Sequence, residues 1–135
     1  MITDNQIEEA FGRHLEAAYI ADIVWPNATE NLPPKPYLVV QHVPGIRRSP
    51  GLGAGGGEEV TGSFVVTVVT DVNKFSTQAN DLAAEVMARF PRAVPIPCGD
   101  GKLRPGPQNP VALVAGRDGA DWRQPVRIAY IATMR

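Results

Sequence analysis

Residues 51–72 read GLGAGGGEEVTGSFVVTVVTDV. The letters from Gly51 to Gly56 spell G-x-G-x-x-G, the fingerprint of a dinucleotide-binding turn. In that motif a helix must leave the turn, so that its N-terminal amides face the pyrophosphate. Here the glycines lead into a segment rich in Val and Thr, which is typical of a strand. No Gly-Lys-Ser/Thr follows, so the pattern does not fit a phosphate-binding P-loop either. The stretch therefore predicts a loop that precedes a strand.

We expect this glycine-rich loop to span residues 45–57, with Arg47 and Arg48 at its base. It is too long for a tight hairpin, and long loops in compact domains are often functional or disordered. Its glycines lose the most entropy on ordering, which favours a loop that stays mobile until something holds it. Two readings remain open: a solvated mobile loop, or a loop that orders against a neighbouring subunit or DNA. The glycines concerned are Gly51, Gly53, Gly55 and Gly56.

Strands are predicted on both sides of the loop. Residues 37–43 are rich in β-branched and aromatic residues, and residues 59–72 form a longer run of the same kind. In the second run both alternating sets, that with Phe64 and that with Val65, are largely apolar. This pattern predicts a central strand that is covered on both faces.

Two helices are predicted from their periodicity. Residues 3–20 begin with Thr3, which forms a capping box with Gln6, and carry apolar residues at helical spacing. Residues 76–90 give the clearest signal, with Ser76 or Thr77 as the cap and Pro91 ending the helix. Their predicted buried positions are Ala79, Leu82, Ala83, Val86, Met87 and Phe90.

The remaining segments are rich in proline. Four prolines in residues 21–36 argue against a regular element, although Ile23, Val24 and Trp25 should anchor the connection to the core. Residues 91–110 leave room for one short strand, around 101–104. Residues 111–117 and 125–134 are predicted strands, and Asp118-Gly119 between them predicts an antiparallel hairpin.

The order of elements predicts one α+β domain over residues 1–135. It would consist of a mixed, largely antiparallel sheet with two helices packed on it. The chain has 13 Lys and Arg against 14 Asp and Glu, so its charge gives no general attraction to nucleic acid or membrane. Its one cysteine excludes an intrachain disulfide. An acidic N-terminal segment and the lack of a long apolar run lead us to expect neither a signal peptide nor a membrane span.

No catalytic signature emerges from the polar residues. Neither His14 nor His42 has a cysteine or carboxylate at metal-ligand spacing, and Cys98 lies in a Pro/Gly-rich loop. The carboxylates are scattered, and Trp122 is best explained as a cover for the hairpin end. We therefore expect no catalytic residue, cofactor or metal, and we expect that the protein is not an enzyme.

Several stretches, taken in order, resemble the phage tail terminator (tail completion) family, which includes proteins similar to the minor tail protein U of lambda-like phages. They are IEEAFGRHLEA, ADIVWPN, PYLVVQHVP, GSFVVTVVTD, STQANDLAAEVMARFP and DWRQPVRIAYIA. The most telling pieces are Trp25-Pro26-Asn27 and the C-terminal pattern of Trp122, Pro125, Val126, Ile128 and Tyr130. The resemblance covers nearly the whole chain.

The resemblance implies a structural virion protein without catalytic residues or cofactors. Such proteins form a ring, typically a hexamer, on the tail-tube protein, stop tail polymerisation and present a surface to the head–tail connector protein. They are assembled in the host cytoplasm, and gene transfer agents use the same part. DNA passes through the ring, so weak, non-specific lining by Arg47 and Arg48 or by Lys102 and Arg104 is expected. The alternatives are a head–tail connector or stopper protein and, less favoured, a nucleotide-cofactor-binding enzyme.

Overall fold

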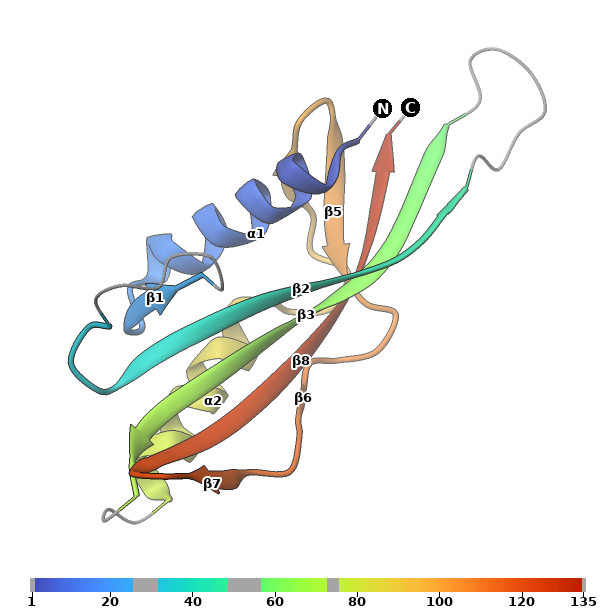
Figure 1. Ribbon diagram of the computed structural model, residues 1–135. Helices are drawn as coiled ribbons and strands as arrows, with labels where there is room; N and C mark the ends of the chain where they lie inside the picture. Colours follow the sequence, from blue (N-terminus) through green and yellow to red (C-terminus); the bar gives the residue numbers. More distant parts are fainter. Residues whose placement is uncertain (1, 26–31, 49–56, 73–75, 135) are drawn as a thin grey trace.

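Two strands of 14 residues each, β3 (Glu58–Asp71) and β8 (Asp121–Met134), form the centre of a mostly antiparallel sheet. The computed structural model describes residues 2–25, 32–48, 57–72 and 76–134. β3 and β8 pair along their whole length, from Glu58 opposite Met134 to Asp71 opposite Asp121. Figure 1 shows this pair as a long twisted ribbon that runs through the molecule. The predicted central position of the Val-rich strand is confirmed.

The other strands extend the sheet on both sides in the order β1-β2-β3-β8-β5-β4. β6 and β7 pair with β8 further along the edge that it shares with β5. Only the β1–β2 pair is parallel among the described strands. The bounds of these strands are β1 (Asp22–Val24), β2 (Tyr37–Arg48), β4 (Ile96–Cys98), β5 (Gly101–Pro105), β6 (Val111–Ala112) and β7 (Gly116–Asp118).

Helix α1 (Asp4–Ala18) begins with the predicted capping box. The Thr3 hydroxyl accepts a hydrogen bond from the Gln6 amide, and the Gln6 side chain accepts one from the Thr3 amide. This reciprocal pair satisfies two of the amide donors that a helix start leaves without a partner. The buried face of α1 consists of Ile7, Ala10, Phe11, Gly12 and Leu15.

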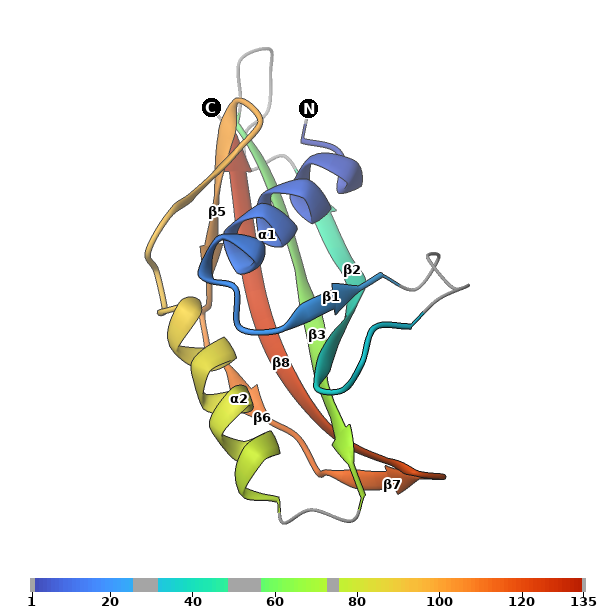
Figure 2. The ribbon, with the colours of Figure 1, turned by 90° about the vertical axis from the view of Figure 1, so that its left-hand side faces the viewer.

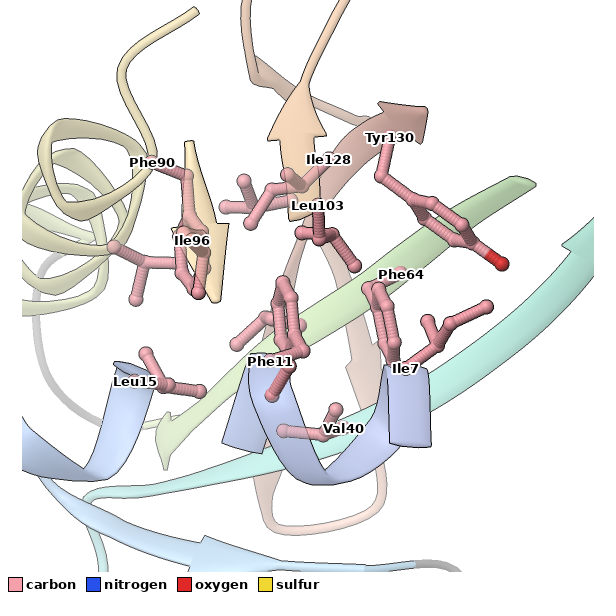
Figure 3. Packing of buried hydrophobic residues seen from close by; sticks show 14 of the residues in the cluster. Ile7, Phe11, Leu15, Val40, Phe64, Phe90, Ile96, Leu103, Ile128 and Tyr130 are labelled. Atoms are coloured by element: carbon pink, nitrogen blue, oxygen red, sulfur yellow. The ribbon is translucent and has the colours of Figure 1, made fainter. Parts of the chain in front are cut away.

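Helix α2 (Thr77–Arg89) packs beside α1 on the same face of the sheet (Figure 2). Phe11 of α1 is stacked between Phe64 of β3 and Phe90, at ring-centroid distances of 3.8 and 4.4 Å. Figure 3 shows these rings between the helices and the sheet, with Ile128 and Leu103 beside them. Of the predicted α2 face, Ala79, Ala83, Val86 and Phe90 are buried, while Leu82 and Met87 are half-buried at the margin.

Among the described residues, no helix packs on the second face of the sheet, contrary to the prediction that β3 is covered on both sides. Leu38, Phe64, Val66, Val126 and Ile128 face the helices and belong to the core. Of the alternate residues of β3, Val65 and Thr67 are half-buried, and only Val69, beside the buried Tyr37 at the far end of β3, is fully buried. Valine suits a strand on either face, so composition alone did not distinguish a covered face from an open one.

Two segments that we expected to be irregular form strands. Residues 22–24 make the short strand β1, parallel to residues 37–39, and Ile96–Cys98 make β4, antiparallel to β5. Each of these strands contains only three residues, so the strand preference of their sequence is weak. The prolines around them give a stronger indication of irregular structure. Their pairing partners are distant or follow a turn, and the tertiary context therefore decides their structure.

The expected loop at 45–57 begins too early, because β2 continues to Arg48, whereas its C-terminal boundary agrees with the start of β3 at Glu58. The register of β2 against β3 shifts between Pro44 and Arg47, which marks a bulge. A Cβ on Gly45 would lie 2.4 Å from the Thr61 carbonyl oxygen, so this approach requires glycine. Gly45, which we expected to be the first residue of the loop, therefore belongs to the bulge. The predicted 111–117 strand is likewise divided into β6 and β7, and β7 forms the expected antiparallel hairpin with β8 around Gly119, whose φ is +62°.

Candidate assembly surfaces

Arg47, at the base of the glycine-rich loop, is held by carboxylates. Its guanidinium donates to Glu58 Oε1 at 2.6 Å and to the Ile2 carbonyl oxygen at 2.5 Å, and it lies 3.4 Å from Asp4. Glu58 in turn accepts a hydrogen bond from the Ile2 amide at 2.9 Å. The N-terminal segment, β2 and β3 are therefore tied together by one arginine.

Arg48 makes a second bridge between the same two strands, because its guanidinium lies 2.9–3.0 Å from Glu59 Oε1. Arg48 and Glu59 are opposite each other in the ladder. Both arginines of the expected contact loop thus have carboxylate partners, and their charge is largely neutralised. The glycines Gly51, Gly53, Gly55 and Gly56 lie outside the described residues.

Lys102 and Arg104, the two predicted channel-lining cations, lie on the open face of the sheet. They flank the buried Leu103 in β5 and are paired with Thr133 and Ile131 of β8. Arg104 donates a hydrogen bond to Thr133 Oγ1 at 3.4 Å, and Lys102 is exposed. The structure therefore brings these two residues together and separates them from Arg47, which contacts the helix side.

A groove of about 690 Å³ runs between α1 and the strands β1 and β2. Its apolar wall includes Ile23 and Trp25, and its outer wall carries Glu8, Glu9 and Glu16 of α1. The Trp25 ring lies directly over Gly12, where a Cβ would approach a ring carbon to 2.7 Å. Trp25 thus anchors the β1 connection as predicted, and its neighbours Pro26 and Asn27 lie outside the described residues.

His42 lies at the floor of this groove with its side chain only 5% exposed. Its Nδ1 is 3.2 Å from Glu8 Oε2, its Nε2 is 2.7 Å from the Tyr130 hydroxyl, and its ring is stacked on Phe64. Burial raises the pKa of Tyr130 to about 12. The Tyr130 hydroxyl, the buried His42 imidazole and the partly exposed Glu8 carboxyl therefore form one chain that links α1, β2 and β8.

The other polar residues considered in the sequence are structural. The His14 ring lies 2.9 Å from the Arg89 carbonyl oxygen, and its burial lowers its pKa. Cys98 is buried, and burial raises the pKa of its thiol, which disfavours the reactive thiolate. Trp122 lies within β8, half-buried against the core, opposite Arg117 and Thr70.

No group of three or more His, Cys, Asp or Glu side chains is placed to hold a metal ion within residues 2–25, 32–48, 57–72 and 76–134. Over the same residues, no helix has the length and hydropathy required to cross a bilayer.

The acidic wall of the groove was not singled out from the sequence, and neither was Arg127, which has no ion pair with another described residue. Glu8 and His42 are distant in the chain, so no spacing pattern links them. The sequence indicated the position of Arg127 in part, because this residue stands between Val126 and Ile128, which are buried. That alternation predicts an outward position only when the covered face is known.

Comparison with known proteins gives both a family and a fold. A family model described as "Phage tail terminator protein" matches residues 6–130. A comparison with curated proteins found no match. One solved structure, whose name says nothing of its role, covers 98% of this chain with a TM-score of 0.76 at 22% identity, and the match spans 96% of its own length. A second, a chain from the virion of a native gene transfer agent particle, covers 94% with a TM-score of 0.57 at 18% identity, spanning 92% of its own length.

Proposed function

The chain belongs to the phage tail terminator family, as a structural protein of the virion tail, and from this premise we propose that it forms a ring on the end of the tail tube. The ring stops polymerisation of the tube and offers the surface to which the head–tail connector binds. The observation that carries the proposal is the family match over residues 6–130. The resemblance noted in the sequence thus agrees with an independent comparison.

The physical properties of the described residues support a role in assembly. Neither of the two described helices packs on the open face of the sheet, and the half-buried valines of that face are suited to contact with another protein. The ends of β2 and β3 are cross-linked by Arg47, Arg48 and their glutamates, which gives a firm base to whatever the loop contacts.

The fold shared with a chain of a gene transfer agent virion extends the proposal to such particles. We place the protein in the tail of a phage or of a phage-derived gene transfer agent. A ring of six copies is the stoichiometry that the family resemblance implies.

The test is a tube-capping assay. Purified protein is mixed with assembling tail-tube protein, and tube ends and tube lengths are measured by electron microscopy. We expect rings on one end of each tube and a shorter, narrower length distribution. Protein that never associates with tubes but binds the connector would instead support the head–tail stopper alternative.

A second measurement addresses the enzyme alternative. Nicotinamide and flavin nucleotides are titrated while the melting temperature is followed, because a ligand that binds the folded state raises it. We expect no change, since a strand and not a helix follows the glycine-rich segment. A saturable rise would contradict the assignment of a purely structural role.

A further inference from the structure

The open face of the sheet is a defined surface on one side of the molecule. Its side chains come from alternate positions of β2, β3 and β8, and the register places Gln41, Val65 and Arg127 in one row and Val43, Ser63 and Ala129 in the next. Both helices pack on the opposite face (Figure 2). The open face is therefore available along the middle of the sheet.

Three cations on this face have no ion-pair partner among the described residues: Lys102, Arg104 and Arg127. Lys102 and Arg127 are exposed, and Arg104 contacts only the Thr133 hydroxyl. The carboxylates on the same face, at its two ends, are already paired. Glu59 binds Arg48, while Asp71 and Asp121 both bind Lys35. Arg127 lies in the middle of the open face, Arg104 is opposite Ile131, and Lys102 is opposite Thr133 in the row of Glu59. The unpaired positive charge thus extends from the middle of the open face to the end that carries β5.

The helix side has the opposite charge where α1 borders the groove. Glu9 is paired only with Arg13 of its own helix, and both side chains are more than half exposed. Glu16 is exposed and has no ion pair within the described part of the chain. Together with the apolar ring of Trp25, these residues make an acidic, partly apolar concave surface.

A shared sheet between copies is a poor alternative at the β4 edge. Pro97 lies within β4 and Pro95 directly precedes it. Proline lacks the amide that an added strand would need as a hydrogen-bond donor. Contact between the open sheet face of one copy and the helix side of another uses side chains, so it does not need these backbone amides. Opposite charges on opposite sides of one subunit favour head-to-tail association, in which one side of each copy contacts the other side of the next. Such an assembly closes into a ring when the rotation from copy to copy brings the last copy back to the first.

We propose that the open sheet face of one copy, around Lys102 and Arg127, packs against the α1 groove of the next copy, around Glu9 and Glu16. The inference rests on the proposed ring and names the two surfaces that build it. The cations of each copy meet the carboxylates of its neighbour, and the valines of the sheet meet the groove that contains Trp25. Each subunit uses both surfaces once.

The test uses two charge-reversed variants. The first is Lys102→Glu with Arg127→Glu, and the second is Glu9→Lys with Glu16→Lys. Each alone sets like charges against each other at every contact, so neither should form rings at concentrations at which the wild type is fully assembled. An equimolar mixture should restore rings, because alternating copies make every contact complementary. Native mass spectrometry distinguishes such mixed rings, which must contain equal numbers of both variants.

Matched controls carry the same changes in net charge elsewhere. They are Arg92→Glu with Arg117→Glu, and Asp81→Lys with Glu85→Lys on α2, all at exposed or half-exposed positions. Both controls should form rings like the wild type, and circular dichroism should show all variants folded. Rings from either test variant alone, or no recovery on mixing, would overturn the proposed surfaces and leave the ring itself intact. A wild type that forms no ring, alone or on tubes, would instead refute the proposed function.

Discussion

His14 and Arg89 exchange two hydrogen bonds across the C-terminal ends of the two helices. The His14 Nε2–H donates to the Arg89 carbonyl oxygen at 2.9 Å, and the Arg89 Nε–H donates to the His14 carbonyl oxygen at 2.8 Å. The Arg89 carbonyl ends α2, where no intrahelical donor is available, and the His14 carbonyl lies near the last turn of α1. This pair joins α1 to α2 above the stacked Phe11 and Phe90.

The His14–Arg89 pair predicts a loss of stability on mild acidification. Burial, opposed by the bond to Arg89, lowers the pKa of His14 below its ordinary value of 6.5. The unfolded chain therefore binds a proton at higher pH than the folded protein, so the His14 contribution is complete above pH 6.5 and declines as the pH falls below it. Urea unfolding at several pH values measures this decline.

His14→Gln is the control, because glutamine can donate to the same carbonyl without titrating. We expect the variant to be less stable than the wild type by about 1 kcal/mol at neutral pH. The difference should narrow as the pH falls below 6.5. A constant difference would assign the acid sensitivity to other groups.

Tyr130 predicts a second, alkaline loss of stability. Its pKa is raised to about 12, chiefly by burial, with Asp4 adding to the effect. The unfolded tyrosine ionises near pH 10, so the contribution is complete below pH 10 and is lost between there and about 12. Tyr130→Phe should cost roughly 1–3 kcal/mol at neutral pH, because His42 loses a buried partner, and should flatten the alkaline decline. An alkaline curve identical to that of the wild type would contradict this assignment.

Gly62 predicts a steric effect under the same tyrosine. A Cβ there would lie 2.6 Å from the Tyr130 hydroxyl and 2.8 Å from the Val43 carbonyl oxygen. We expect Gly62→Ala to destabilise the fold by about 1–3 kcal/mol through overpacking. Gly116→Ala, also in a strand but with nothing within 4 Å of its Cβ, is the matched control and should be nearly neutral. Equal effects in chemical denaturation would indicate a general cost of removing strand glycines.

Shortening the glycine-rich segment should separate folding from assembly. Removal of residues 51–56 leaves Arg47, Arg48, Glu58 and Glu59 in place, and these already connect the strand ends. We expect circular dichroism and the melting temperature to change little, while tube capping weakens. Loss of folding would show that the segment has a structural role, and unchanged capping would remove it from the list of contact surfaces.

The sequence predicted those elements whose signal is local. The capping box of Thr3 and Gln6 and the periodic face of α2 depend on residues within a few positions of each other, and both were found where expected. The turn at Asp118-Gly119 is similar, because the conformation of one glycine decides it. The α+β class followed from the order of these elements.

Features that depend on distant partners were missed. β1 exists because β2 offers it an edge, and the Gly45 bulge is decided by the carbonyl of Thr61 across the ladder. The same holds for the assembly surfaces, since Lys102 and Arg104 join the sheet face that carries Arg127 only through the pairing of β5 and β8. The sequence suggested that Lys102 and Arg104 are surface cations, but it did not reveal that the Arg47 charge is neutralised by Glu58.

The place of β8 has a consequence for synthesis on the ribosome. This strand follows every other strand in the chain, yet it lies inside the sheet, between β3 and β5. Until residues 121–134 emerge, β3 has no second neighbour and β5 has no strand to join it to the rest. Sheets closed by such distant pairing form late and slowly. The cations of β5 and β8 come together in the same step, so the proposed contact face cannot form before residues 121–134 have been made.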